Sequence, residues 1–108
     1  MEATAAHTNQ YNENGECQGL WRYWHQNGRM LSEGHYESGL KEGEWQEWYP
    51  NGELRIVGKY ENGEQVGIWQ VRYDNGQLES KGEFVNGKKA GIWKYWLRNG
   101  EGNGQLEW

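Results

Sequence analysis

The stretch Gly43 to Gly67, GEWQEWYPNGELRIVGKYENGEQVG, decides the fold, because its pattern recurs along the 108-residue chain at a constant step of 24 residues. The recurring residues are Trp21, Trp45, Trp69 and Trp93; Asn27-Gly28, Asn51-Gly52, Asn75-Gly76 and Asn99-Gly100; Gly34, Gly58 and Gly82; Tyr36, Tyr60 and Phe84. A fixed period of this length is typical of repeat proteins, in which each unit buries its apolar side by stacking on its neighbours.

The composition indicates that aromatic rings supply most of the buried apolar surface. The chain has eight Trp, seven Tyr and one Phe but only 34% hydrophobic residues. Large rings at regular spacing argue against disorder beyond the first residues. The formal charge of −5, with no cluster of Lys or Arg, disfavours a nucleic-acid partner, which would need a basic stripe.

The repeat sets the domain boundaries. We expect a disordered tail over 1–10 and one β-repeat domain over 11–108, since the repeat leaves no room for an internal boundary. Within the domain we assign a partial cap to 11–18, complete repeats to 19–42, 43–66 and 67–90, and a partial repeat to 91–108.

Two turn signals in each unit predict β-hairpins. Asn-Gly between alternating segments is typical of a two-residue type I′ turn. A two-residue turn at Asn27-Gly28 places Trp21 opposite Gly34 and His25 opposite Met30. The same register pairs Trp45 with Gly58 and Trp69 with Gly82, so we expect each indole to cover the glycine of its own hairpin.

Alternation along the strands predicts one packed face and one polar face. The packed face would carry the tryptophans, the paired glycines, Tyr36, Tyr60 and Phe84 as a structural core, joined by Met30, Leu54 and Leu78. We therefore predict an all-β meander of antiparallel hairpins, about seven or eight strands in one elongated, twisted and curled sheet. In the last unit, we expect a longer loop or a turn moved to Asn103-Gly104.

The pattern G-x-W-x-x-W-x-x-N-G-x-L-x-x-x-G-x-Y-x-N-G, seen in GEWQEWYPNGELRIVGKYENG, resembles the MORN-repeat variant (MORN_2-like) of bacterial proteins described as YwqK-type antitoxins. The resemblance covers Gly19 to Gly100 well. It implies an elongated meander of β-hairpins that binds proteins or, in other MORN proteins, membrane lipids.

A second aromatic row follows the first by three residues and is the candidate partner-binding site. Its members are Trp24, Trp48, Arg72 and Trp96. Exposed aromatics near arginine are typical interface anchors. The alternative is local support within the sheet, with Trp24 opposite Leu31, Trp48 opposite Arg55 as a cation-π pair, and Arg72 opposite Glu79.

No arrangement of residues predicts catalysis. The sequence shows no Ser/His/Asp or Cys/His constellation, no metal-ligand spacing and no phosphate loop, and Cys17 has neither a disulfide partner nor a basic neighbour. We therefore expect no enzyme, no metal and no cofactor.

These observations favour a protein-binding module, with toxin neutralisation as its most specific form. The alternatives are a structural or self-associating stack, pairing through edge strands, and glycan or lipid binding through the exposed aromatics. The sequence predicts no transmembrane segment and shows no signal peptide, which favours a cytoplasmic protein, although a signal peptide already removed would leave the same sequence.

Overall fold

The computed structural model describes residues 8–108 as nine β-strands without a helix. The strands are β1 (Gln10–Tyr11), β2 (Cys17–Trp24), β3 (Met30–Glu37), β4 (Leu40–Trp48), β5 (Leu54–Glu61), β6 (Glu64–Arg72), β7 (Leu78–Val85), β8 (Lys88–Trp96) and β9 (Gly102–Glu107). Each complete repeat supplies one hairpin, so the strands follow the 24-residue period.

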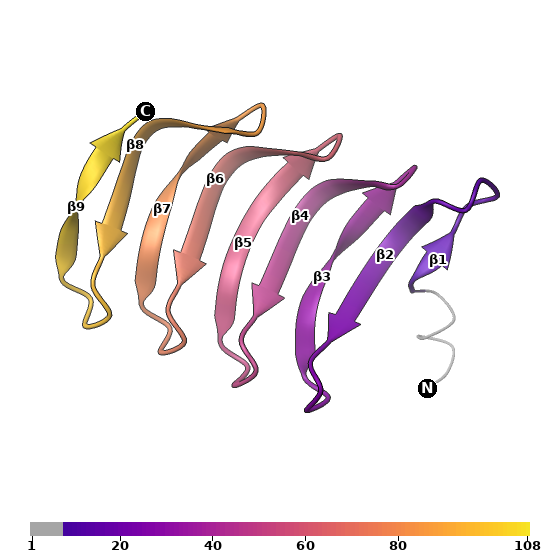
Figure 1. Ribbon diagram of the computed structural model, residues 1–108, viewed down its shortest axis with the longest axis horizontal. Coiled ribbons are helices and arrows are strands. Elements are labelled where there is room, and N and C mark those ends of the chain that lie inside the picture. Colours follow the sequence, from indigo (N-terminus) through magenta and orange to yellow (C-terminus); the bar gives the residue numbers. More distant parts are fainter. Residues whose placement is uncertain (1–7) are drawn as a thin grey trace.

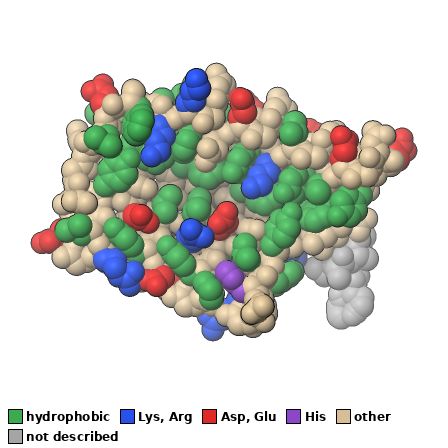
Figure 2. All heavy atoms as spheres, in the orientation of Figure 1, with side chains coloured by type: hydrophobic (Ala, Val, Ile, Leu, Met, Phe, Trp, Pro, Cys, Tyr) green, Lys and Arg blue, Asp and Glu red, His purple; other side chains and the backbone are tan. Residues whose placement is uncertain are grey.

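All nine strands form one open antiparallel sheet in sequence order (Figure 1). The molecule measures 47 × 32 × 15 Å, and its shortest dimension is the thickness of a single layer. Figure 2 shows one face of this sheet, with hydrophobic side chains in rows across the strands and charged side chains between them. The predicted all-β meander of hairpins is confirmed.

The count of about seven or eight strands was too low. The cap contributes β1, and the partial last repeat contributes a full pair, β8 and β9. Residues 1–7 of the predicted tail lie outside the described residues, but Gln10, its last residue, already pairs with Gln18 in the sheet.

Two kinds of turn alternate along the sheet. The turns after the Tyr- or Phe-bearing strands have positive φ at both central residues: 49° and 83° at Ser38-Gly39, and 51° and 83° at Asn62-Gly63. Asn86-Gly87 follows the same pattern. These are type I′ turns, whose twist matches that of the flanking strands.

The Asn-Gly turns after the Trp-bearing strands differ from the prediction. In the first, the Gly28 amide donates to the His25 carbonyl and the His25 amide donates to the Arg29 carbonyl. Only the glycine has positive φ, 88°. This is a three-residue loop, a type I turn closed by a glycine bulge. The predicted two-residue turn, and with it the pairing of His25 with Met30, is wrong.

A β-bulge in the next strand restores the register. Trp24 pairs with Met30 and Tyr23 pairs with Ser32, so Leu31 is the extra residue. Beyond the bulge, Trp21 faces Gly34, as predicted. Trp45 likewise pairs with Gly58, and Trp69 with Gly82. The longer loop and the bulge each displace the register by one residue, in opposite senses, so the outer pairing is unchanged.

The last hairpin keeps the same loop. The Leu97 amide donates to the Glu101 carbonyl, and Trp96 pairs with Gly102. Neither expected change, a longer loop or a turn at Asn103-Gly104, occurs. Leu106 takes the position of the periodic glycines, opposite Trp93.

The indole over each glycine comes from the following repeat. A Cβ added to Gly34 would overlap the ring of Trp45, at Gly58 that of Trp69, and at Gly82 that of Trp93. The expectation that each tryptophan covers its own hairpin's glycine is therefore wrong, although the two residues are cross-strand partners. The reason is that both strands beside each glycine carry a tryptophan. The indole of the following repeat, and not that of the glycine's own hairpin, occupies the space beside the glycine.

Aromatic rings form one ladder along this face, the aromatic face. Successive rings lie 5.0 to 6.4 Å apart and meet edge to face at 73° to 88°. The ladder runs through Tyr11, Trp21, Tyr36, Trp45, Tyr60, Trp69, Phe84 and Trp93. The four tryptophans are buried, and the rings between them from Tyr36 to Phe84 are half-buried. Edge-to-face pairs add to the free energy gained by burial alone.

Each indole N–H also donates a hydrogen bond to a backbone carbonyl. The Trp45 Nε1–H donates to the His35 carbonyl at 3.0 Å, and the Trp93 Nε1–H donates to the Glu83 carbonyl at 3.0 Å. Gly43, with φ of 75°, lies in the irregular part of the pairing between β3 and β4. Where the hydrogen bonding between the two strands is interrupted, carbonyl groups lack amide donors, and the indole N–H supplies one.

Replacing Gly58 with Val tests the contact with Trp69. The new side chain would enter the space of the Trp69 ring, so we expect a loss of about 1–3 kcal/mol or more in the free energy of unfolding. Gly102→Ala is the matched control, because φ there is not positive and no atom lies within 4 Å of the added Cβ. Equal denaturant midpoints for the two variants would contradict the packing.

Removing the Trp69 ring tests the ladder. Trp69→Ala should lower the free energy of unfolding by about 3–5 kcal/mol, because a buried indole leaves a cavity between two repeats. Trp24→Ala, which removes an indole that is 56% exposed, should cost far less. Chemical denaturation of both variants gives the comparison, and a smaller loss at Trp69 than at Trp24 would refute the assignment of the core.

Candidate functional site

The second aromatic row lies along the sheet face opposite the ladder. Ile92 and Lys94 flank the buried Trp93 in strand β8, so they project to the other side of the sheet. They line one hollow together with Trp96 and Leu78. Arg72, Leu78 and Trp96 line the adjacent hollow. We call this side the opposite face.

The bulges change which residues join this row. Trp24 pairs with Met30, Trp48 with Leu54, and Arg72 with Leu78. The predicted partners Leu31, Arg55 and Glu79 are therefore wrong, because each is the bulge residue of its hairpin. Cross-strand partners share a face, so Met30, Leu54 and Leu78 belong to the row and not to the aromatic face. We call the seven residues Trp24, Met30, Trp48, Leu54, Arg72, Leu78 and Trp96 the strip.

The members of the row differ in exposure. Trp24 is 56% exposed, whereas Trp48, Arg72 and Trp96 are half-buried. The Trp24 indole therefore offers the largest free aromatic surface of the row, and the other three members combine exposure with contacts inside the sheet.

Arg72 is held by its own hairpin. Its Nη1 donates to the Gly76 carbonyl at 2.9 Å and its Nη2 to the Gln70 Oε1 at 3.0 Å. Its buried Nε has no hydrogen-bond partner in the structure. The guanidinium is thus fixed within the strip. The predicted cation-π pair of Arg55 with Trp48 does not form, because Arg55 lies over the Tyr49 ring at 5.6 Å.

An apolar hollow adjoins the strip at strands β6 to β8. Its lining includes Ile68, Leu78, Ile92 and Trp96, with the two isoleucines 56% and 50% exposed. Lys81 and Lys94 line it as well. Glu83 lines it too, so the hollow joins apolar surface to a small excess of positive charge, a combination suited to an apolar protein surface that carries acidic groups.

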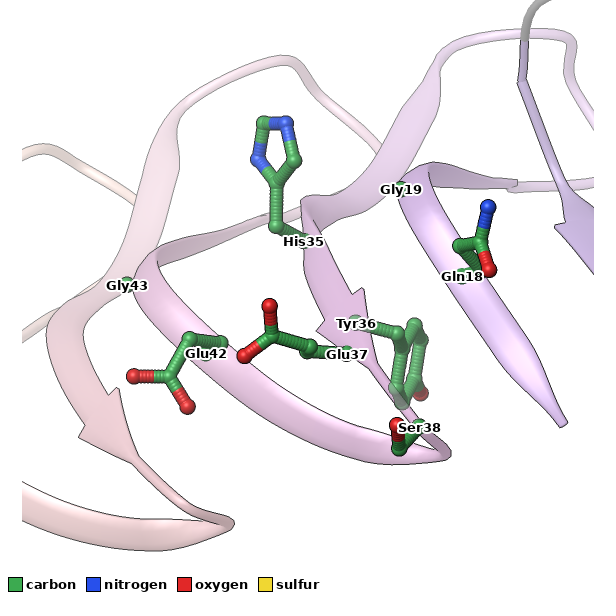
Figure 3. A pocket seen from close by; sticks show the side chains of 8 residues that line it. All are labelled: Gln18, Gly19, His35, Tyr36, Glu37, Ser38, Glu42 and Gly43. Carbon is green, nitrogen blue, oxygen red and sulfur yellow. The ribbon is translucent and has the colours of Figure 1, made fainter. Parts of the chain in front are cut away.

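Another hollow lies near strands β2 to β4, and its lining includes several polar side chains. Its volume is 740 Å³, and Figure 3 shows the side chains that line it. Glu37 and Glu42 lie on the same side of it, and His35 extends away from them. Glu42 Oε1 accepts a hydrogen bond from the Asn62 amide at 2.9 Å, so this carboxylate supports the next turn.

The described residues contain no group of three His, Cys, Asp or Glu placed to hold a metal. Cys17 is a free, half-buried cysteine. Within residues 8–108 there is also no helix that could span a membrane.

Two tyrosines of the aromatic face are held neutral. Desolvation by burial raises the pKa of Tyr36, and its hydrogen bond with Tyr23 adds to this effect. Desolvation likewise raises the pKa of Tyr60, with a smaller contribution from the charge of Glu47. Because folding raises both pKa values above 10.0, their contribution to stability is present below that pH and is lost as the pH rises beyond it.

A chain of hydrogen bonds between repeats was missed at the sequence level. The side chains of Asn27, Asn51 and Asn75 each donate to a carbonyl 23 residues later, at 2.8 to 2.9 Å. Tyr49 and Tyr73 donate in the same sense to the carbonyls of Arg72 and Trp96. The periodic recurrence of asparagine was the available signal.

Comparison with known families identifies the repeat. The family model described as "MORN repeat variant" matches residues 18–38, 41–63 and 65–86, more than half of the chain. The chain belongs to the MORN repeat variant family. MORN repeats are generally non-catalytic modules that bind membranes or proteins. No curated protein matches the chain.

The family matches coincide with the observed hairpins. The first matched segment spans β2 and β3, and the next two span the following hairpins. The fourth hairpin, β8 and β9, lies beyond the matched segments, yet its loop and register are the same. The MORN repeat architecture therefore extends through the last hairpin.

The hydroxyl of Tyr49 tests the link between repeats. Tyr49→Phe removes the 2.6 Å bond to the Arg72 carbonyl, so we expect a loss of about 1 kcal/mol in the free energy of unfolding. Tyr11→Phe is the control, because Tyr11 is 63% exposed and enters the ladder through its ring. Thermal unfolding of both variants makes the comparison, and equal stability would show that the bond contributes nothing.

Proposed function

We propose that this MORN repeat protein is a protein-binding module and that the strip is its contact surface. The observation that carries the proposal is the largely exposed indole of Trp24, at the end of a row that continues through Trp48 to the fixed Arg72 and Trp96. Tryptophan and arginine are the residues that most often dominate binding energy at protein interfaces. The general binding role of MORN repeats supports the same reading.

The geometry favours a partner that lies across several strands. A tryptophan or arginine of the strip recurs once in each hairpin, and the hairpins are fixed relative to one another by the aromatic ladder and the asparagine bonds. A rigid row of anchors loses little conformational entropy on binding. Neutralisation of a toxin protein, by covering its surface, is the most specific form of this proposal and rests on the resemblance to YwqK-type antitoxins.

A structural role is the second candidate. The ladder passes from repeat to repeat without interruption from Tyr11 to Trp93, as expected of a stack stabilised by nearest-neighbour contacts. In that case the strip would support the sheet and would bind no other protein.

Affinity capture from the source organism's lysate distinguishes the two candidates. We expect the wild type to retain one stoichiometric protein of a different sequence, which a folded Trp24/Trp48/Trp96→Ala variant does not retain. The interaction is then reconstituted from the two purified proteins and measured by calorimetry with wild type and variant.

Trp108→Ala is the matched control, because Trp108 is 59% exposed and contacts Lys89 near the core Trp93. Loss of binding by both variants would place the contact elsewhere. Undiminished binding by the strip variant would rule out the strip, and absence of any captured protein would favour the structural role.

A further inference from the structure

The opposite face carries the same hollow twice, 48 residues apart, with its charge reversed. Near strands β2 to β4, the lining includes Leu20, Glu33, His35, Glu44 and Gln46. The equivalent positions near strands β6 to β8 are Ile68, Lys81, Glu83, Ile92 and Lys94. Glu33 and Glu44 outnumber Arg22, the cation that Glu33 holds at the first end, and Lys81 and Lys94 outnumber Glu83 at the second, so the two ends carry opposite net charge and the second is also apolar.

Within residues 8–108, nothing covers this face. All described strands belong to one sheet, and domains usually bury a sheet face against a second layer. The half-exposed Ile68 and Ile92 are the surface such a layer would cover. The sheet measures 47 × 32 Å in its plane, so a contact of about 800 Å² per partner needs little more than half of the face.

A two-fold axis parallel to the strands and through β5 brings the unlike ends together. With nine strands in sequence order, this axis places β3 against β7 of a second copy and β2 against β8. Glu33 then faces Lys81, and Leu20 faces Ile92. An isologous contact of this kind makes each favourable pair twice.

Like charges near this contact are already accommodated. Arg22, which would face Lys94, is held by Glu33 at 2.7 Å. Lys59, on β5 at the axis, is an exposed lysine whose long side chain can extend to the solvent. His35 of β3 meets Glu83 of β7, a pair that does not repel.

We propose that the opposite face is a docking surface for a second copy of this chain, packed face to face about an axis parallel to the strands. This dimer goes beyond the proposed function and does not depend on it. Because the strip lies on the same face, the dimer hides the strip. A protein partner and the second copy therefore compete for one surface.

Sedimentation velocity over a range of protein concentrations tests the dimer. The wild type should pass from monomer to dimer, and Lys81→Glu should raise the dissociation constant about tenfold or more, since it sets two carboxylates against each other twice. Glu33→Lys should do the same with the opposite sign. Lys88→Glu, at an exposed lysine outside both hollows, should leave the dissociation constant unchanged.

Exchanging the charges of Glu33 and Lys81 gives the decisive result. Mixing Lys81→Glu with Glu33→Lys restores both unlike pairs, so the mixture should dimerise at concentrations where neither variant does so alone. The double variant should also dimerise by itself. A wild type that stays monomeric up to about 1 mM, or a mixture that remains monomeric, would overturn the proposal. Either result leaves the capture of a different protein untouched, so the two proposals fail separately.

Discussion

The contact between an indole and the bare backbone of a glycine in the preceding repeat holds this sheet together. A ring can lie flat on the strand at Gly34, Gly58 and Gly82 because these residues have no side chain. The ring then meets the Tyr or Phe rings on both sides, and its N–H binds a backbone carbonyl. Trp45 and Trp93 thus join two repeats by packing and by hydrogen bonding, whereas Trp69 joins them by packing and donates its N–H to Val66 of its own strand. This is how a single layer with few aliphatic residues acquires a core.

Stability in such a stack is a sum over neighbouring repeats. The aromatic ladder connects the hairpins through one face, and the asparagine side chains connect their loops at one edge. The ring contacts and the hydrogen bonds both join neighbouring repeats, so a repeat at either end of the sheet has such contacts on one side only. The last hairpin shows the consequence, since Leu106 stands in the glycine position and is 57% exposed.

The period of 24 residues was sufficient to predict the hairpins, their order and the pairing of Trp with Gly. It could not distinguish a two-residue turn from a three-residue loop followed by a bulge, because the two preserve the same pairing at Trp21 and Gly34. That difference moves Leu78 to the face that carries Trp96. The pattern also could not show which of two facing tryptophans covers a glycine. The first error arises because the spacing fixes the pairing only beyond the bulge, and the second because it does not fix the direction of a large side chain.

The candidate site was likewise predicted only in part from the sequence. Periodicity indicated Trp24, Trp48, Arg72 and Trp96 as one row, but the neighbours of the row and the apolar hollow beside it follow from the bulges. One face is thus used for cohesion between repeats, and the other is the face that we propose for binding. The opposite face changes between repeats of this chain, as Glu33 and Lys81 at equivalent positions show, while the aromatic face keeps its rings.

Nuclear Overhauser effects at the Gly58 Cα protons test this account most directly, because they report which indole lies over the glycine. The structure predicts strong effects to the ring protons of Trp69, with the glycine resonances shifted upfield by that ring, and weaker effects to Trp45. Strong effects to Trp45 alone would show that each repeat covers its own glycine, and would contradict an assembly held together by contacts between repeats.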